Sequence, residues 1–536
     1  MIVDDQSEVI DFLFTSAAHG SAAAVRRIET HGAMVFLSGE SAVKLKRAVR
    51  SDYMDYSTVA RRRAACEAEV RVNRRTAPSI YRCARAIVRR PDGQVAWDGP
   101  GEVLDWVVCM VRFDENLVLD ELAQRHELTA ELVDGLADAV ARFHEHAEPM
   151  PAYGGRAGIS RVLAENAGEL ARYPDLFDQA EVADFAAAAD ASLAVRASRL
   201  ELRRRNGLVR RCHGDLHLRN VCLVDGKPTL FDAIEFCESF ACIDVFYDLA
   251  FMLMDLWRRG LKAEANRLIN RYLWRRDDID GLGALPLFLS CRAAIRAHVA
   301  AATRASRSQS TGTDDTSGED ARAYFALAGT CLAPPPPRLI AIGGLSGSGK
   351  STIARLMAPE FGGIPGALVL QSDVVRKRLF DVDPEARLPV SAYYLAASER
   401  TYALLRDHAC TALAAGASVI VDAVHVRPEE RRAIEKVAVD SGALFAGFWL
   451  DAPGRVLRRR VARRGRDVSD ATIGVVERQE RYSIGEMSWR RISSLAGPAA
   501  IAAQLCALAA GSAVPDLNGI ATANREDGGQ AAPGSF

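Results

Sequence analysis

The stretch Arg338-Leu-Ile-Ala-Ile-Gly-Gly344-Leu-Ser-Gly-Ser-Gly349-Lys350-Ser351-Thr-Ile-Ala-Arg355 begins as an apolar run, breaks into glycines and continues with a helical pattern. A strand, a tight loop and a helix in this order are typical of an α/β nucleotide-binding domain. From Gly344 onward the loop matches the pattern GxxxxGK followed by Ser or Thr. The stretch therefore predicts a phosphate-binding loop.

Each residue type in this loop has a task in phosphate binding. Glycines let backbone N–H groups surround phosphate oxygens, a lysine neutralises the β- and γ-phosphates, and a serine hydroxyl can bind Mg²⁺. Lysine is rare in this chain, at seven of the 68 basic residues, so Lys350 is unlikely to match by chance. We predict that Lys350 is catalytic and that the residues contacting ATP are Gly344, Ser346, Gly347, Ser348, Gly349, Lys350, Ser351 and Thr352, with Ser351 also at the metal.

Two later runs place carboxylates at the ends of expected strands. The β-branched run 417–422 ends in Asp422, which could hold the metal through water at the carboxyl edge of a buried strand. The run 367–373 ends in Asp373, and Arg376 follows one helical turn later. This pair suits a base and an acceptor clamp, although Asp373 could instead be a plain helix N-cap.

The densest basic run of the chain spans residues 455–466. Arg455, Arg459 and Arg463 share one helical face, so Arg459 and Arg463 are predicted to close on the transferring phosphate as a lid. A solvated helix face and a nucleic-acid patch are the alternatives. No aromatic residue interleaves the arginines, which disfavours nucleic acid.

A second constellation lies in the N-terminal half. His213-Gly-Asp215-Leu-His217-Leu-Arg-Asn220 is followed by a predicted hairpin and then by Asp232. This is the catalytic pattern of the protein-kinase fold, in which Asp215 receives the proton of the substrate hydroxyl and Asn220 and Asp232 hold Mg²⁺. We expect His217 to be structural.

The same fold needs an early strand lysine paired with a helix glutamate. Lys44 and Lys46 lie two residues apart, on one face of an expected strand, and the alignment of VKLK with VAIK favours Lys46 with Lys44 in reserve. The following helical segment offers Glu67 or Glu69, and Glu69 is preferred because it precedes an apolar position.

The composition describes the chain as a whole. Its 536 residues suffice for two or three domains, and 49% hydrophobic with 26% charged residues is typical of globular proteins. The 68 basic and 69 acidic residues cancel to a net charge of −1, so neither nucleic acid nor a membrane is an expected partner. Eleven cysteines without a CxxC pair and an acidic N-terminus without a signal pattern predict a cytoplasmic protein. No oligomeric state is indicated.

The chain divides near its prolines. Residues 303–320 lose apolar periodicity and predict a flexible loop, and Pro334 to Pro337 form a stiff spacer. We therefore expect domains at residues 1–333 and 338–514. The Ala-rich stretch 499–514 is expected to be a terminal helix of a soluble domain, and residues 515–536 a disordered tail.

The second domain resembles small P-loop kinases of the group that includes gluconate kinase, polynucleotide 5′-kinase and chloramphenicol phosphotransferase. The similarity rests on GLSGSGKST, QSDVVRKRLF, VIVDAVHVRPEERR and RVLRRRVARRGRDVSDAT, with Arg478 and Gln479 after them. It implies an α/β P-loop fold with a parallel sheet and helices on both faces. It also implies that Asp373 is the base, that Arg376 touches the acceptor and that Arg459 or Arg463 is a lid arginine.

The first domain resembles the aminoglycoside phosphotransferase and choline kinase family, through HGDLHLRN, FDAIEF and FYDLAFML. The resemblance implies an α+β bilobal domain of protein-kinase type, with an N-lobe at about 23–105 and a C-lobe at about 106–333. The stretch from Asp105 to Phe113 is similar to the hinge that holds adenine. The chain departs from protein kinases in lacking GxGxxG, since only Gly32 and Gly39 lie near the expected phosphate-covering hairpin.

The acceptor is expected to differ from an antibiotic amine. Polycations need carboxylates, yet the segment 285–307, where helices of this family approach the acceptor, has no acid. Its basic residues are Arg292, Arg296, His298, Arg304 and Arg307. We therefore predict neutral or anionic small molecules with a hydroxyl as substrates.

The leading hypothesis is a bifunctional protein with two ATP- and Mg²⁺-dependent phosphotransferase domains. In the main alternative, one domain binds ATP and regulates a single active small-molecule kinase. A protein kinase in the N-terminal half and a non-enzymatic P-loop interaction module are further alternatives. The absent glycine loop counts against the first of these, and the presence of Asp373 with the lid arginines counts against the second.

Overall fold

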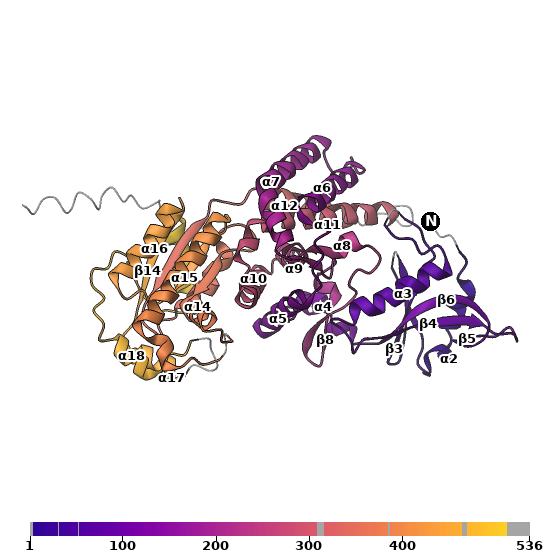
Figure 1. Cartoon of the computed structure of the whole chain (residues 1–536), viewed down its shortest axis with the longest axis horizontal. Coiled ribbons are helices and arrows are strands. Elements are labelled where there is room, and N and C mark those ends of the chain that lie inside the picture. The colour runs from indigo at the N-terminus through magenta and orange to yellow at the C-terminus, as the bar shows by residue number, and fades with distance from the viewer. Residues whose placement is uncertain are drawn as a thin grey trace, which may run out of the picture. The chain divides into compact units, whose positions relative to one another are not determined.

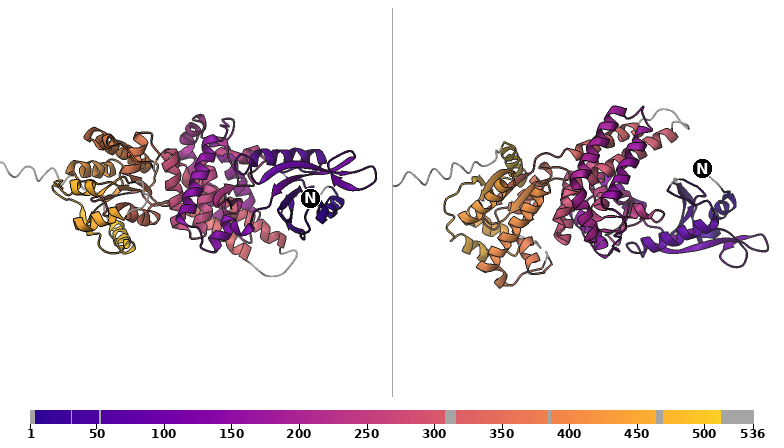
Figure 2. Two further views of the ribbon diagram at one scale, coloured as in Figure 1. Left: turned by 90° about the horizontal axis from the view of Figure 1, so that it is seen from below. Right: turned by 45° about the horizontal axis from the view of Figure 1, so that its top comes forward.

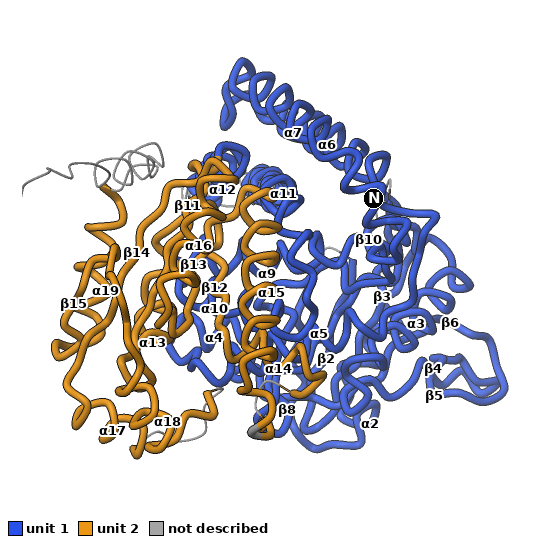
Figure 3. The backbone as a smooth tube through the Cα atoms, turned by 60° about the vertical axis from the view of Figure 1, so that its left-hand side comes forward, with its two compact units in different colours: residues 1–333 blue, residues 334–536 orange. Residues whose placement is uncertain are grey.

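The computed structural model describes residues 4–30, 32–51, 53–307, 316–383, 386–463 and 469–511. The chain divides into two compact units, residues 1–333 and residues 334–536 (Figure 3). The tail predicted for 515–536 lies outside the described residues, as does part of the loop predicted for 303–320. On both sides of that part, at 303–307 and 316–320, the chain is helical where a loop was expected.

The N-lobe of the first unit is a six-stranded antiparallel sheet in the order β1-β2-β3-β6-β4-β5, with helix α3 packed on it (Figure 1). Strand β6 runs to Val111, beyond the lobe boundary expected near residue 105, because Val107 and Val108 are fully buried in the sheet. The elements are β1 (Arg26–Glu29), β2 (Ala33–Ser38), β3 (Ser41–Lys46), α3 (Val59–Asn73), β4 (Tyr81–Arg89), β5 (Val95–Trp97) and β6 (Glu102–Val111).

Two short helices before β1, α1 (Ser7–Leu13) and α2 (Ser16–His19), belong to the same lobe. The apolar side of α1 enters the sheet core, where Val9 and Leu13 pack with Phe36, Leu45, Ile87 and Val107. Just before α1, the side chain of Gln6 donates to the carbonyl of Lys46 at 2.8 Å and to the carboxylate of Asp105 at 2.7 Å. The chain N-terminal to β1 is therefore part of the lobe's core.

The C-lobe is mainly helical, as two further views show (Figure 2). Two short antiparallel strand pairs, β7 with β10 and β8 with β9, lie on either side of the loop that contains Asp215. The elements are α4 (Leu119–Gln124), α5 (Ala130–His146), α6 (Gly155–Ala171), α7 (Gln179–Arg205), β7 (Val209–Arg211), β8 (Val221–Val224), β9 (Lys227–Leu230), α8 (Glu238–Ala241), β10 (Cys242–Asp244), α9 (Val245–Arg258), α10 (Lys262–Arg276), α11 (Leu285–Arg307) and α12 (Thr316–Leu332).

Helix α11 lies in the core of this lobe, packed against α6, α9 and α12. Its segment Leu285–Ala305 is long and apolar enough to cross a membrane by length and composition, and 61% of it is buried inside the protein. Burial by neighbouring helices is the ordinary state of a core helix of this composition.

The second unit is built on a five-stranded parallel sheet in the order β12-β13-β11-β14-β15. Helices α13 and α19 pack on one face, and α15 and α16 cover the other. The elements are β11 (Arg338–Gly343), α13 (Lys350–Met357), β12 (Leu368–Gln371), α14 (Ser372–Leu379), α15 (Leu395–Ala414), β13 (Val419–Asp422), α16 (Pro428–Asp440), β14 (Leu444–Asp451), α17 (Gly454–Ala462), α18 (Ile473–Gln479), β15 (Arg490–Ser493) and α19 (Pro498–Ala510).

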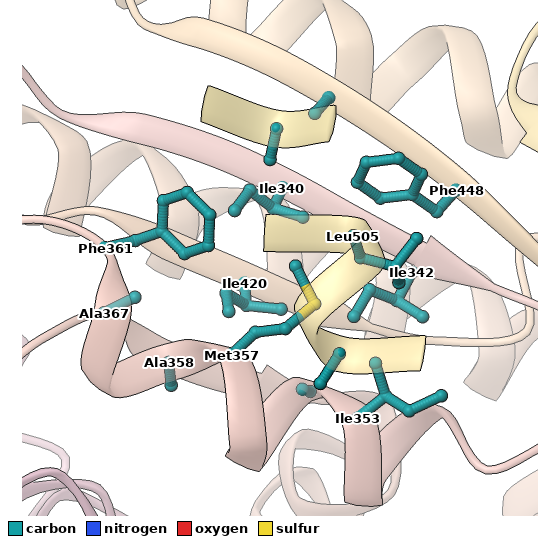
Figure 4. Close-up of a cluster of buried hydrophobic side chains, with 14 of the residues drawn as sticks. Ile340, Ile342, Ile353, Met357, Ala358, Phe361, Ala367, Ile420, Phe448 and Leu505 are labelled. Carbon is teal, nitrogen blue, oxygen red and sulfur yellow. The ribbon is translucent and has the colours of Figure 1, made fainter. Parts of the chain in front are cut away.

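Branched and aromatic side chains fill the layer between the sheet and α13 (Figure 4). Ile340 and Ile342 of β11 face Ile353 and Met357 of α13, and Leu505 of α19 closes the layer. Because alternate residues of a strand point to opposite faces, the other strand residues are free to bury against α15 and α16. This packing fixes where α13 begins relative to the end of β11, and the glycine-rich loop lies between the two.

Candidate active sites

The loop between β7 and β8 brings Asp215 and Asn220 together. The amide nitrogen of Asn220 donates to Oδ2 and to the carbonyl oxygen of Asp215, both at 2.9 Å. Nε2 of His217 lies 3.3 Å from the same Oδ2. Burial alone would raise the pKa of the Asp215 carboxyl, but His217, His213 and Arg292 hold it well below its usual range. Asp215 is therefore ionised and able to accept a proton, and His217 contacts it where only a structural role was expected.

Asp248 on α9 fixes the backbone of this loop. Its carboxylate accepts the N–H groups of His213 at 3.0 Å and Gly214 at 2.8 Å, and His144 lies 3.1 Å away. Burial tends to raise the pKa of Asp248, whereas the hydrogen bond from His144 lowers it. The net result is a pKa below the usual value of an aspartate. The loop that carries Asp215 is thus held by a buried, ionised carboxylate.

The two lysines of β3 contact the same glutamate but differ in their second carboxylate partner. Glu69 is fully buried and contacts the ammonium groups of both Lys44 and Lys46. Nζ of Lys44 also lies 2.6 Å from Asp232, whereas Nζ of Lys46 lies 2.5 Å from Glu235. The alternative glutamate, Glu67, is exposed and pairs only along its own helix in the ion pairs recorded for the described residues. The structure therefore favours Lys44, the reserve choice, because it alone bridges Glu69 to the metal-site aspartate.

Replacing each lysine by methionine separates these roles. Lys44→Met is expected to lower kcat/KM of the first domain by about 10²–10³-fold, the loss of one charge-stabilising donor. Lys46→Met leaves the buried Glu235 without its cation and should mainly lower Tm. Steady-state kinetics and thermal melts of both variants check this. A kinetic loss confined to Lys46→Met would restore Lys46 as the phosphate lysine.

The oxygens of Asn220 and Asp232 form a donor set suited to Mg²⁺. Carboxylate and amide oxygens are the ligands that this cation prefers. The side chain of Asp232 is 43% exposed, so it can contact a nucleotide-bound ion while it also pairs with Lys44. The residues present therefore fit the metal that the sequence predicts at this site.

The phosphate-binding loop of the second unit has the backbone that its glycines predict. Gly347 and Gly349 have φ of 84° and 95°, in the left-handed region, and a side chain at Gly347 would meet the carbonyl of Leu457 at 2.7 Å. Nζ of Lys350 donates to the carbonyl of Leu345 at 3.2 Å. The loop residues from Ser346 to Thr352 line a cavity of about 1780 Å³.

Asp422 stands at the end of β13 beside this loop, in register with Gln371 of β12 and Ile342 of β11. Burial raises the pKa of its carboxyl, while Lys350 and a hydrogen bond with Ser351 act in the opposite direction. The predicted metal residues Ser351 and Asp422 are thus in contact. A hydroxyl and a carboxylate next to the loop lysine are a donor set for nucleotide-bound Mg²⁺.

Asp373 and Arg376 both line the same cavity. The N-cap of α14 is Gln371, so Asp373 does not take the capping position that was its alternative role. Nη1 of Arg376 donates to the carbonyl of Ala392 at 2.7 Å, and its guanidinium lies over the ring of Tyr393. This part of the cavity therefore contains a carboxylate and a guanidinium, and the guanidinium is fixed in place.

The lid arginines differ from expectation at one position. Leu457 and Val461 of α17 are buried, and Arg459 is on the opposite side of the helix, exposed and outside the cavity lining. Arg463 does line the cavity. Arg460, which flanks the buried side, donates to the carbonyl of Ser494 at 2.7 Å and lies 3.5 Å from the carbonyl of Gly347. Arg460 therefore replaces Arg459 as the arginine nearest the loop.

Gln479 at the end of α18 contacts the loop directly. Its Oε1 accepts the backbone N–H of Ser346 at 2.8 Å. Val476 of α18 packs with Leu457 and Val461, and Leu345 of the loop packs on this cluster. The apolar contact holds α18 against the loop, so that Gln479 occupies one of its N–H donors.

Removing this contact should loosen the loop. Gln479→Ala is expected to weaken ATP binding of the second domain several-fold, because an ordered N–H then loses its partner. The neighbouring Glu480, which pairs with Arg458 away from the loop, supplies the control variant Glu480→Gln. Nucleotide titration of the full chain checks this result. Equal affinities in Gln479→Ala and the unchanged chain would contradict it.

Two sites, each with an aspartate, a lysine and oxygens suited to Mg²⁺, are the arrangement expected of an ATP-dependent phosphotransferase. Family models agree with the two folds. Residues 24–285 match the model described as the phosphotransferase enzyme family, and residues 339–483 match that of an AAA domain. The first domain is thus similar to the phosphotransferase enzyme family and the second to an AAA domain, in agreement with the two resemblances that the sequence motifs indicate.

The chain is also similar, over most of its length, to proteins from two Mycobacterium species. Uncharacterized proteins from Mycobacterium tuberculosis and Mycobacterium bovis are 29% identical over 452 residues, which cover 83% of this chain and 87% of each relative.

Similar solved structures each cover one domain. A choline/ethanolamine kinase family protein from Mesorhizobium loti is 12% identical and covers 61% of this chain and 94% of its own, with a TM-score of 0.35. The adenosine phosphosulfate kinase CysC from Mycobacterium tuberculosis is 24% identical and covers 32% of this chain and 98% of its own, with a TM-score of 0.24. A gluconokinase from Sinorhizobium meliloti is 20% identical and covers 32% and 92%, also with a TM-score of 0.24.

Proposed function

We propose that the protein is a bifunctional kinase in which each domain transfers the γ-phosphate of ATP to a hydroxyl of a small molecule. The observation that carries the proposal is the presence of two separate and complete sets of residues. Each domain has an aspartate that can act as a base, a lysine that can bind phosphate and side-chain oxygens that can bind Mg²⁺. A regulatory domain without turnover needs no base, so the two intact sets favour two reactions.

In the first domain, Asp215 accepts the proton of the acceptor hydroxyl. Lys44, oriented by Glu69, binds the α- and β-phosphates of ATP. Asn220 and Asp232 hold Mg²⁺, which neutralises charge on the phosphates when it is bound. Asn220 also fixes the Asp215 carboxylate through its two hydrogen bonds.

In the second domain, the backbone N–H groups of the loop and Lys350 bind the β- and γ-phosphates. Ser351 and Asp422 hold Mg²⁺, Asp373 accepts the acceptor proton, and Arg376 orients the acceptor. Arg460 and Arg463 lie where they can stabilise charge on the phosphoryl group during transfer. The side chain of Arg459 points away from this site.

The acceptors are proposed to be neutral or anionic. This proposal rests on α11, which carries no acidic residue to receive a polycation, and on the arginines that line the cavity of the second domain. We also place the protein in the cytoplasm, because its eleven cysteines are all free and ATP is available there.

Mass spectrometry of a metabolite extract tests the proposal. The extract is incubated with ATP, Mg²⁺ and the unchanged chain, Asp215→Ala or Lys350→Ala, and ions heavier by one phosphoryl group are sought. Each variant is expected to lose one product and keep the other. A product set that depends on a single domain would show that the other domain regulates it.

A further inference from the structure

One cation of α11 lies in a different environment from the others. Arg304 forms an ion pair with Asp175 at 2.7 Å, and Arg296 stacks on the ring of Tyr324. Arg292 points instead into the lobe and is only 5% exposed. No carboxylate of the described residues forms an ion pair with it. The environment of Arg292 thus differs from those of Arg296 and Arg304.

Aromatic rings hold the guanidinium of Arg292. It lies 3.9 Å from the ring centre of Tyr247 and 4.9 Å from that of Phe251, both on α9. Its Nε donates to the carbonyl of Tyr247 at 3.2 Å. Contacts of this kind fix the plane of a guanidinium without neutralising its charge.

Phe251 connects Arg292 to the catalytic loop. The ring of His217 packs edge-on against Phe251 with 5.2 Å between centres, and His217 contacts the Asp215 carboxylate. The charge of Arg292 is also among the influences that lower the pKa of Asp215. Two side chains, those of Phe251 and His217, therefore connect Arg292 to Asp215.

A nitrogen of Arg292 has no partner. Nη2 is buried and forms no hydrogen bond in the described part of the chain. A buried donor without a partner destabilises a fold, and a charged donor does so more strongly. Cation–π contacts offset part of this cost, but they leave the hydrogen-bonding capacity of Nη2 unused in the described part of the chain.

We propose that Arg292 binds an oxyanion of the first domain's acceptor, a carboxylate or a phosphate ester, while the acceptor hydroxyl faces Asp215. The inference rests on the proposed function of this domain. The hydroxyl oxygen bonds to the γ-phosphorus of ATP, the bond from that phosphorus to ADP breaks, and the hydroxyl proton passes to Asp215. The planar, permanently charged guanidinium suits an oxyanion and excludes an amine.

Charge-based fractionation of acceptors tests the inference directly. Small molecules from a cell extract are divided on an anion exchanger at pH 7 into a retained and an unretained fraction. Each fraction is incubated with ATP, Mg²⁺ and the full chain carrying Lys350→Ala, which silences the second domain. Mass spectrometry then seeks a phosphorylated product that Asp215→Asn abolishes.

The expected result is a product from the retained fraction, whose mass also tells a carboxylate from a phosphate ester. A product from the unretained fraction alone would overturn the inference and leave the proposed function standing. Absence of product from both fractions would contradict the proposed function itself, and the inference with it.

Variants of α11 give an independent readout on that acceptor. Arg292→Gln should raise KM for the acceptor about 10-fold or more and leave KM for ATP unchanged, and Arg292→Lys should recover part of the loss. Arg296→Gln removes the same charge one turn away and should change neither KM. Equal changes in both KM values, or an effect of Arg292→Gln on Tm alone, would show a merely structural arginine. If Arg292→Gln does not fold, Arg292→Lys carries the same comparison, because it retains charge but not the planar fork.

Discussion

Asp215→Asn is expected to reduce phosphotransfer by the first domain about 10³-fold or more. The substitution keeps the size of the side chain and an oxygen for Asn220, but it removes the carboxylate that we propose as the base. The amide of asparagine cannot take up the hydroxyl proton in its place. Kinetics with the first domain's acceptor, measured at saturating ATP, check this result.

The controls for Asp215→Asn lie in the same chain. ATP binding should be retained, because Lys44, Asn220 and Asp232 are unchanged, and the second domain's reaction should proceed at its normal rate. Loss of both reactions would contradict independent sites. Retention of more than about a tenth of the first domain's rate would exclude Asp215 as a base that contributes the usual 10²–10⁴-fold.

Lys350→Ala is expected to abolish the second domain's reaction, again by about 10³-fold or more. Lys350 is the only lysine of the loop, and it opens α13, where the helix dipole also favours phosphate. An alanine leaves the backbone N–H groups in place but removes the cation that neutralises the β- and γ-phosphates. Initial rates with the second domain's acceptor measure the loss.

A second effect of Lys350→Ala concerns Asp422. Lys350 opposes the rise in pKa that burial imposes on the Asp422 carboxyl, so its removal should raise this pKa further. A raised pKa means that the ionised form, which the metal needs, is lost at a higher pH as the solution is acidified. Residual activity of the variant should therefore fall at higher pH than in the unchanged chain. An unshifted acid limb would show that Asp422 does not hold the metal.

The fold and most of the site residues could be predicted from local sequence patterns. The loop from Gly344 to Ser351, the Asp215–Asn220 pair and the choice of Glu69 over Glu67 all depend on residues close together in the chain or on helix periodicity. Such features follow from local spacing, because the backbone geometry of a loop or helix determines which nearby residues lie together. The structure places all of them at two sites.

The sequence alone could not decide between candidate residues that differ only in their contacts with distant parts of the chain. Lys44 and Lys46 share a strand face, and only the position of Asp232, 188 residues later than Lys44, distinguishes them. The contact between Gln479 and Ser346 spans 133 residues and leaves no local pattern. For Arg459 a local signal did exist, because Leu457 and Val461 mark the buried side of α17 and place Arg459 opposite to it. The spacing of the arginines alone does not show which side of α17 is buried.

Helix α1 shows that a homology boundary is not a folding boundary. The family match begins at residue 24, yet Val9 and Leu13 are part of the sheet core, and Gln6 joins Lys46 at the end of β3 to Asp105 of β6. A chain shortened to the matched residues would expose that core and free the strand that carries both lysines. Dissection of this protein into its two units should therefore retain the first residues, because the strand that carries Lys44 and Lys46 depends on a segment that lies outside the family match.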